Sequence, residues 1–244
     1  GKEHDGKLTL FDAVEAALSV EGLQRLRLGS LESVEVEARL LNLMEKDKRL
    51  CRQLHLPLQA GCDTTLARMH RPYDTRRFTE LLADIRKRIP DIAITTDIIA
   101  GFPGETEEDH QEVLAFVDEM EFERLGVFAY SAEEDTPAAG FADQIPEETK
   151  EERRDEIMEL QQEIAFEKAE GMTGQDVLVM IEGKVADENA YVGRTYKDAP
   201  NVDGLVFVNT DRELMTGDFV PVHITGSYEY DLIGEIKDEN EFTK

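Results

Sequence analysis

The pattern of apolar and polar residues divides the chain into two parts with different periods. From Leu10 to Gly171, amphipathic helical spacing alternates with short apolar runs that are typical of buried strands. After Met172 the period changes to two, and short apolar runs are separated by turns rich in Gly, Asp and Asn. The first part therefore predicts an α/β fold with a parallel sheet, as a complete or partial barrel, and the second a small all-β domain of the OB-like kind.

The spacing also predicts where the individual elements lie. The predicted helices span 10–21, 34–48, 76–88, 107–120 and 146–171. The predicted strands of the first part span 23–28, 54–59, 94–100 and 124–130, and those of the second span 177–181, 205–208, 219–224 and 232–234. We therefore expect a barrel domain over residues 1–145, a connecting helix over 146–172 and a β domain over 173–244.

Residues 94–106 are the stretch around which the first part is organised. A β-branched run is stopped by the turn Gly-Phe-Pro-Gly at 101–104, and Thr106 with three following carboxylates opens the next helix. Loops after the carboxyl ends of parallel strands hold the ligands of such folds. Asp97 is costly to bury in this run, so we expect it either to bond with neighbouring backbone or to contact a ligand.

Two other polar features leave more than one interpretation. His55 lies in a predicted strand, where a satisfied core histidine is a more common role than a metal or substrate ligand. Residues 68–73, Arg-Met-His-Arg-Pro-Tyr, form a basic island in an acidic chain. This island either binds an anion or pairs with neighbouring acids, and the sequence favours neither.

Charge and cysteine content narrow the class of protein. The chain of 244 residues has a net charge of -27, which disfavours phosphate backbones and favours a basic protein partner, unless the acidity serves solubility alone. Its two cysteines, Cys51 and Cys62, are too few for a disulfide scaffold or a self-contained iron–sulfur cluster. No apolar run approaches 18 residues, so we expect a cytoplasmic protein without membrane contact, and a monomer.

Five stretches of the sequence resemble, in order, motifs of the radical-SAM methylthiotransferases: 27–32, 56–62, 68–71, 96–106 and 130–139. The second half is most similar to the RimO-type branch, which methylthiolates an aspartate of ribosomal protein S-twelve, and the β domain resembles a TRAM domain. The first half, at 29–32 and 59–62, is closer to the relatives that modify transfer RNA.

The resemblance implies cofactors that this sequence does not fully hold. Such enzymes cleave S-adenosylmethionine (SAM) at a 4Fe-4S cluster bound by a CxxxCxxC loop, and carry a second 4Fe-4S cluster on an N-terminal domain. Neither motif occurs here, so the chain resembles the part of the enzyme that follows the cluster loop. We therefore assign no metal ligand and no catalytic residue within it, and expect the chain alone to be inactive.

The resemblance also implies a set of SAM-binding residues: Ser30, Glu32, Gln59, Asp97, Phe102, Pro103 and Gly104. Within it, Gln59 and Asp97 would bond to polar groups of SAM, and the turn over 102–104 would pack around the adenine. Three functions then compete. The full-length enzyme modifies a basic ribosomal protein held by acids of the β domain; it modifies transfer RNA; or the chain is a non-catalytic binding module. The acids considered are Asp198, Asp203 and Glu229, each of which either faces the partner or caps a turn within the domain.

Overall fold

The computed structural model describes residues 8–237. The chain divides into two compact units, Gly1–Leu160 and Gln161–Lys244. Across 8–237, none of the helices has the length and apolar character needed to span a membrane.

The first unit is built on an open, three-stranded parallel sheet. Strands β1 (Gln53–His55), β2 (Ala93–Ala100) and β3 (Arg124–Ala129) lie in the order β1-β2-β3 and pair in parallel, which confirms the predicted α/β class. The crossover helices are α3 (Asp63–Arg68), α4 (Thr75–Arg88) and α5 (Glu107–Met120). Before the sheet lie α1 (Leu10–Leu18), the 3₁₀ turn η2 (Ser33–Glu35) and α2 (Ala38–Lys46).

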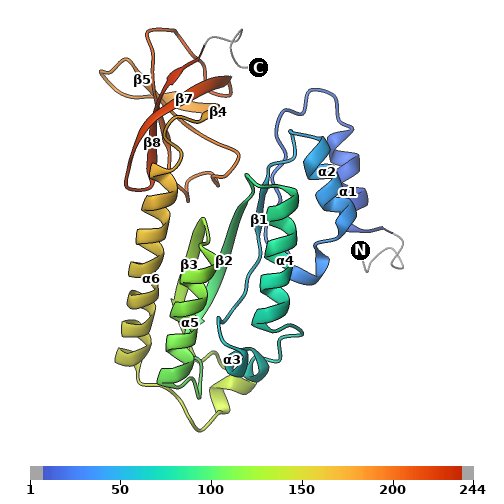
Figure 1. Cartoon of the computed structure of the whole chain (residues 1–244), viewed down its shortest axis with the longest axis vertical. Coiled ribbons are helices and arrows are strands. Elements are labelled where there is room, and N and C mark those ends of the chain that lie inside the picture. Colours follow the sequence, from blue (N-terminus) through green and yellow to red (C-terminus); the bar gives the residue numbers. More distant parts are fainter. Residues whose placement is uncertain (1–7, 238–244) are drawn as a thin grey trace. The chain divides into compact units, whose positions relative to one another are not determined.

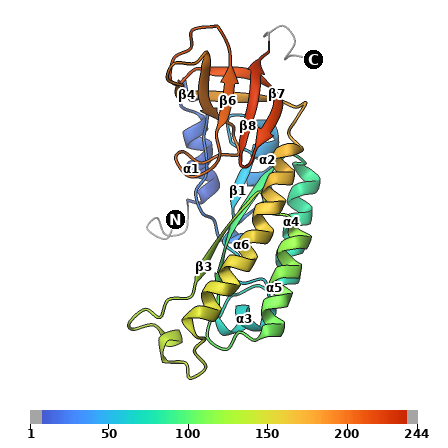
Figure 2. The same ribbon diagram turned by 90° about the vertical axis from the view of Figure 1, so that its left-hand side faces the viewer.

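The two faces of this sheet differ in burial. Helices α4 and α5 lie along one face (Figures 1 and 2). Ile94, Thr96 and Ile98, which share one face of β2 by alternation, are all buried. On the other face Asp97 and Ile99 are partly exposed. Because side chains alternate along a strand, the sheet presents an open face on which polar residues of β1 and β2 lie together.

Two predicted strands of the first unit are wrong in extent. Residues 23–28 form no strand. Leu26 makes a single parallel bridge with Leu50, Ser30 beyond this range makes another with His55, and the one-residue slip between the two bridges breaks the ladder. β1 ends at His55 instead of residue 59, because the Leu58 N–H donates to Thr96 Oγ1 in place of a backbone oxygen of β2, and pairing resumes only at Gln59. Helix α3 was not predicted, since six residues are too few to show a helical period.

The second unit is a closed five-stranded barrel preceded by the end of helix α6 (Glu147–Glu170). Its strands, β4 (Asp176–Lys184), β5 (Ala190–Arg194), β6 (Val206–Asn209), β7 (Phe219–Tyr228) and β8 (Asp231–Ile236), close in the order β4-β5-β6-β8-β7. Only β6 and β8 pair in parallel. This topology confirms the OB-like prediction.

Strand β5 is the element of the barrel that the sequence analysis missed. Its five residues include Gly193, and a glycine inside a short run weakens a strand prediction. The structure explains the glycine, because a Cβ at this position would lie 2.5 Å from the Met180 carbonyl oxygen of β4. Gly193 therefore lets the two strands approach closely while the interior is filled by apolar side chains of all five strands.

Candidate functional site

The carboxyl ends of β1 and β2 are held together by a bulge that fixes Gln59. Two residue pairs, His55 with Thr95 and Gln59 with Ile98, show that the first segment is one residue longer than the second. The Gln59 N–H donates to the Asp97 carbonyl oxygen at 2.8 Å. Gln59 has a φ of 76°, in the left-handed region that residues other than glycine rarely adopt. Such strain is stored most often at functional sites.

The open face of the sheet carries a continuous chain of hydrogen bonds that ends at Asp97. The Gln53 amide donates to Thr95 Oγ1 at 3.2 Å, Thr95 Oγ1 lies 2.9 Å from His55 Nδ1, and His55 Nε2 lies 3.1 Å from Asp97 Oδ2. One arrangement is consistent with all three contacts: the Thr95 hydroxyl donates to Nδ1, and the Nε2–H of His55 donates to the carboxylate. The network therefore orients Asp97 as an acceptor.

The other carboxylate oxygen of Asp97 faces an opening kept by a glycine. Gly126 of β3 pairs with Asp97, and a Cβ at Gly126 would lie 2.7 Å from Asp97 Oδ1. The Asp97 side chain is 36% exposed, and the described residues give Oδ1 no hydrogen bond. Asp97 is thus not the backbone-bonded aspartate of our first interpretation. His55, expected to be a satisfied core residue, is satisfied but lies on this partly exposed face.

The turn over 101–104 is packed more tightly than the sequence suggested. Phe102 is 7% exposed, and its ring lies 5.2 Å from that of Tyr130 and 6.3 Å from that of Phe141, both in edge contacts. Gly101 has a φ of +73°, and a Cβ there would meet the side chain of Lys150 at 2.4 Å. The glycine thus allows helix α6 to approach the turn. Phe102 and Pro103 support the site mainly as buried packing residues.

Helix α6 also fixes this turn through a buried ion pair. Glu105 Oε1 accepts from the Gly101 N–H at 3.1 Å and from Arg153 Nη1 at 2.9 Å, and both side chains are at most 9% exposed. Burial raises the pKa of the Glu105 carboxyl, and these two hydrogen bonds oppose the shift. In the same layer His110 Nε2 lies 2.8 Å from Glu156 Oε2. The loop is therefore held by charges of α6.

Ser30 and Glu32 lie at the edge of the same strand ends. The Leu31 N–H between them donates to the His55 carbonyl oxygen at 3.0 Å, so this segment runs beside the end of β1. Both side chains are exposed. The structure thus brings Gln59 and Asp97 into backbone contact, with Ser30 beside β1, while Phe102 and Pro103 belong to the packed layer around the turn.

The cysteines do not fit an iron–sulfur cluster. Cys51 and Cys62 are both buried, and the Cys62 thiol donates to Thr65 Oγ1 at 3.1 Å. Burial raises the pKa of Cys62 to about 11, which disfavours the thiolate that binds iron. One trio, Cys62 with Asp109 and Glu112, has its ligand atoms within 4.8 Å of one another. However, Asp109 already accepts the N–H of Thr106 as part of the α5 capping box.

The two arginines of the basic island differ: Arg68 forms an ion pair, whereas the Nε of Arg71 is buried and has no hydrogen bond within residues 8–237. Arg68 donates to the Pro103 carbonyl oxygen at 2.8 Å and to Asp143 at 2.6 Å, and its guanidinium lies over the ring of Phe141. For Arg68 the pairing interpretation is therefore confirmed. A wide hollow of about 740 Å³ opens beside it and is lined by Ala67, Arg68, His70, Phe141, Ala142 and Asp143.

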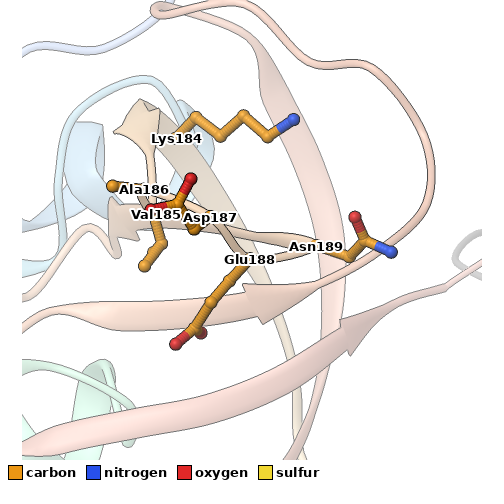
Figure 3. A pocket seen from close by; sticks show the side chains of 6 residues that line it. All are labelled: Lys184, Val185, Ala186, Asp187, Glu188 and Asn189. Atoms are coloured by element: carbon orange, nitrogen blue, oxygen red, sulfur yellow. The ribbon is translucent and has the colours of Figure 1, made fainter.

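A second hollow, of about 470 Å³, lies at the β4–β5 connection and is lined by Lys184, Val185, Ala186, Asp187, Glu188 and Asn189. Figure 3 shows that the side chains of Lys184, Glu188 and Asn189 point away from one another. Because these residues are consecutive and do not converge, the hollow is a feature of the loop and has no built ligand site.

Two of the three acids that we expected to face a partner are structural. Asp198 is 8% exposed, and its Oδ2 accepts from the Thr195 N–H at 2.9 Å and from Thr195 Oγ1 at 2.6 Å. Asp203 Oδ2 accepts from the Ala199 N–H at 2.6 Å. Both carboxylates stabilise the loop between β5 and β6. Of the three, Glu229 is the exposed one, in the turn between β7 and β8.

Comparison with known proteins matches both units. Residues 14–117 match the radical SAM superfamily and residues 173–236 match the TRAM domain. A ribosomal protein uS12 methylthiotransferase RimO of Lachnoclostridium phytofermentans is 46% identical over 229 residues, which is 94% of this chain and 52% of the relative. The chain belongs to the radical-SAM methylthiotransferase family.

Other relatives extend this picture. The RimO proteins of Desulfitobacterium hafniense and of Anaeromyxobacter sp. strain K are 43% and 41% identical over 97% of this chain. The chain spans about half the length of these curated relatives, 53% and 50% respectively. The similarity to radical-SAM methylthiotransferases thus includes both the three-stranded sheet of the first unit and the barrel of the second.

Several residues that build this candidate site were missed from the sequence. Gln53 and Thr95 are linked to Asp97 through His55, and Gly126 lies beside Asp97. Glu105 and Lys150 contact Gly101 of the turn, and Arg153 holds Glu105. A polar residue in a β-branched run was a signal for Thr95. Nothing local marked Lys150 and Arg153, because Lys150 lies against the distant Gly101 and Arg153 donates to Glu105, 48 residues away along the chain.

Proposed function

We propose that this chain forms the SAM-binding strand ends and the TRAM module of a methylthiotransferase that modifies ribosomal protein uS12. The observation that carries the proposal is that identity to relatives named as uS12 methylthiotransferases extends over both units. The oriented Asp97 and the strained Gln59 at the open end of the sheet support cofactor binding there. A ribosomal substrate would place the enzyme in the cytoplasm.

The residues present fit SAM better than they fit an iron–sulfur cluster. The open face has an oriented carboxylate and a glycine that leaves space beside it, and Gln53 Oε1 is buried without a hydrogen-bond partner. SAM supplies the reactive sulfonium when bound. The chain would hold it, with Asp97 as acceptor for its hydroxyl or ammonium groups and Gln59 as a second polar contact.

Binding of SAM tests the two central residues. In a cluster-loaded full-length enzyme that carries this sequence, Asp97→Ala and Gln59→Ala are each expected to weaken SAM binding. The loss should be about tenfold for Asp97, because a hydrogen bond to a charged group contributes about 1.5–3 kcal/mol. Calorimetric titration measures both affinities, with Asp84→Ala on the exposed surface of α4 as control. Unchanged affinity in both variants would remove these residues from the site.

The substrate proposal can be tested on exposed acids of the barrel. Glu188 and Glu229 lie in two loops of the OB-like fold and are both exposed. Reversing both to Lys is expected to weaken binding of the basic uS12 protein about threefold to tenfold at low salt, since exposed charges mainly steer association. Asp84→Lys on the other unit is the control, and pull-down with titrated uS12 gives the affinity.

The same double variant separates the competing functions. A transfer-RNA substrate would bind the Glu188→Lys and Glu229→Lys variant more tightly, because the added lysines attract phosphates. The first-half motifs favour transfer RNA, but Asp and Glu far outnumber Lys and Arg in residues 173–244. Tighter RNA binding with unchanged uS12 binding would therefore favour transfer RNA over uS12 as the substrate. A non-catalytic module is the third possibility, and SAM-independent binding of uS12 would favour it.

A further inference from the structure

Lys150, in the first turns of α6, is a buried cation that lies between the ends of β2 and β3. Its side chain is 8% exposed, and its Nζ donates to the carbonyl oxygen of Tyr130, the residue directly after β3, at 3.0 Å. Its Cβ and Cγ occupy the space that a Cβ would need on Gly101, the residue directly after β2. One side chain therefore contacts the first residue of both loops.

Tyr130 depends on this contact because its own hydroxyl holds nothing. The Tyr130 hydroxyl is buried and has no hydrogen-bond partner among residues 8–237. Its N–H donates to the Ala100 carbonyl oxygen at 2.9 Å, and its ring lies 5.2 Å from that of Phe102 in an edge contact. The Lys150 ammonium lies 5.5 Å from the centre of the same ring, where the ring face attracts a cation. Lys150 thus orients both the backbone and the ring of Tyr130.

The ammonium itself is not needed to fill this space. Burying a charged group is costly, and the other partner of Lys150 Nζ is Glu147 Oε2 at 2.8 Å, on a side chain that is 67% exposed. An exposed carboxylate compensates little of that cost, because solvent screens the pair. A methionine at this position would touch Gly101 with the same Cβ and Cγ and would bury no charge. The buried hydrogen bond to Tyr130 is therefore what distinguishes lysine here.

The two loops that Lys150 joins border the candidate site. Pairing between β2 and β3 ends with Ala100 and Ala129, so beyond that pair the spacing of the chain depends mainly on other contacts. Asp97 lies in the last part of β2, opposite Gly126 of β3. A ligand held at Asp97 must fit between the loops that follow these strands, and small displacements of a binding group cost affinity.

We propose that Lys150 is a positioning residue for SAM binding. Its ammonium holds the Tyr130 carbonyl oxygen while its stem lies against Gly101, and the two contacts together fix the spacing of the loops after β2 and β3. The assignment rests on the proposed function, because it takes SAM as the ligand of these strand ends. It adds a residue of α6 that acts through the loops and does not touch the cofactor.

The variant Lys150→Met keeps the stem against Gly101 and removes only the ammonium. In the 244-residue chain, amide hydrogen exchange over 99–105 and 129–135 is expected to become about tenfold faster, since the loops lose a hydrogen bond to a charged donor. In a cluster-loaded full-length enzyme that carries this sequence, calorimetric titration should show SAM binding weakened about threefold to tenfold. Lys150→Arg should recover part of both effects, because a guanidinium can donate to the same carbonyl oxygen.

The matched control is Glu147→Gln, which removes the exposed partner of the same ammonium and should change neither measurement. The peptide of α4 over 75–88 is the reference for global stability. Faster exchange in α4 to the same extent as in the loops would mean a purely structural role and would overturn the proposal. Unchanged loop exchange in Lys150→Met, or an Arg variant that behaves like the Met variant, would overturn it as well.

The affinity for SAM separates this proposal from the proposed function. Looser loops with unchanged SAM affinity in Lys150→Met would refute the positioning role and leave SAM binding at the strand ends intact. If the wild-type enzyme does not bind SAM, the proposed function fails and the role of Lys150 fails with it. Looser loops with weaker SAM binding, both partly recovered by Lys150→Arg, are the result that supports the assignment.

Discussion

Replacing Arg153 by Met is expected to lower the free energy of unfolding of the first unit by about 3–5 kcal/mol. The reason is the burial of its partner: the Glu105 side chain is 2% exposed, and Arg153 Nη1 donates to Glu105 Oε1 at 2.9 Å and to the Glu105 carbonyl oxygen at 3.1 Å. Without the guanidinium, Glu105 would retain only the Gly101 N–H as a hydrogen-bond donor. An uncompensated buried carboxylate is among the few causes of such a large loss.

The loss should depend on pH with a definite sign. Burial holds the pKa of Glu105 above its ordinary value of 4.5 in the folded protein. A raised carboxyl pKa stabilises the fold below the unfolded pKa, and this stabilisation is lost as pH rises through the folded pKa. Removing Arg153 raises the folded pKa further. The difference between wild type and Arg153→Met is therefore largest near neutral pH and shrinks as Glu105 becomes protonated.

Urea denaturation followed by circular dichroism at pH 7.5 and pH 5 measures this difference. Arg154→Met, in the next position of α6 and at an exposed ion pair, is the control and should change stability by less than about 0.5 kcal/mol. The double variant Glu105→Gln with Arg153→Met should be more stable than Arg153→Met alone, since it removes the unpaired charge. A loss that is independent of pH, or equal in the double variant, would refute the buried-charge explanation.

The 244-residue chain, reconstituted with iron and sulfide without oxygen, is expected to hold no stoichiometric 4Fe-4S cluster and to form no 5'-deoxyadenosine from SAM. A cluster with one open iron needs three thiolates, whereas the sequence contains two cysteines. Both are buried, and the pKa of Cys62, raised to about 11 by burial, keeps that group a thiol near neutral pH. We therefore expect cleavage of SAM to be absent from this chain, not merely reduced.

Iron content, the visible absorption of the cluster and chromatographic detection of 5'-deoxyadenosine provide the measurements. The variant with Cys51→Ser and Cys62→Ser is the matched control, and it should give the same background as wild type. A full-length relative that carries the three-cysteine loop is the positive control. One cluster per chain with 5'-deoxyadenosine above that background would contradict the prediction, and would mean that the buried cysteines become accessible.

The sequence was most informative where the hydrophobic period and the capping or turn-forming residues indicate the same element boundary. The central strand was predicted over 94–100 and lies over Ala93–Ala100, and the following helix was predicted from its cap at Thr106, where the capping box is present. The change of period after Met172 correctly indicated a β barrel. These features depend on residues close together in the sequence, so local rules are sufficient to find them.

The site was only partly predictable for the same reason. Gln59, Asp97 and the turn over 101–104 stand out because they interrupt apolar runs at the ends of strands. Their partners do not: His55 is 42 residues from Asp97, and Arg153 is 48 residues from Glu105. Asp198 misled us because residue type alone favours exposure, whereas the fold uses its carboxylate to bond Thr195.

The sequence by itself determined the class of each unit, the order of most elements and the family resemblance, because periodicity and motif spacing are written along the chain. Only the tertiary structure decided that the Gln53–Thr95–His55–Asp97 chain crosses one face of the sheet and that α6 supplies the charges behind the glycine turn. It also showed that Arg68 is paired with Asp143, whereas the buried Nε of Arg71 has no hydrogen bond in the part of the chain that the structure describes. Burial and pairing depend on which distant segments the fold brings together, and no local pattern encodes them.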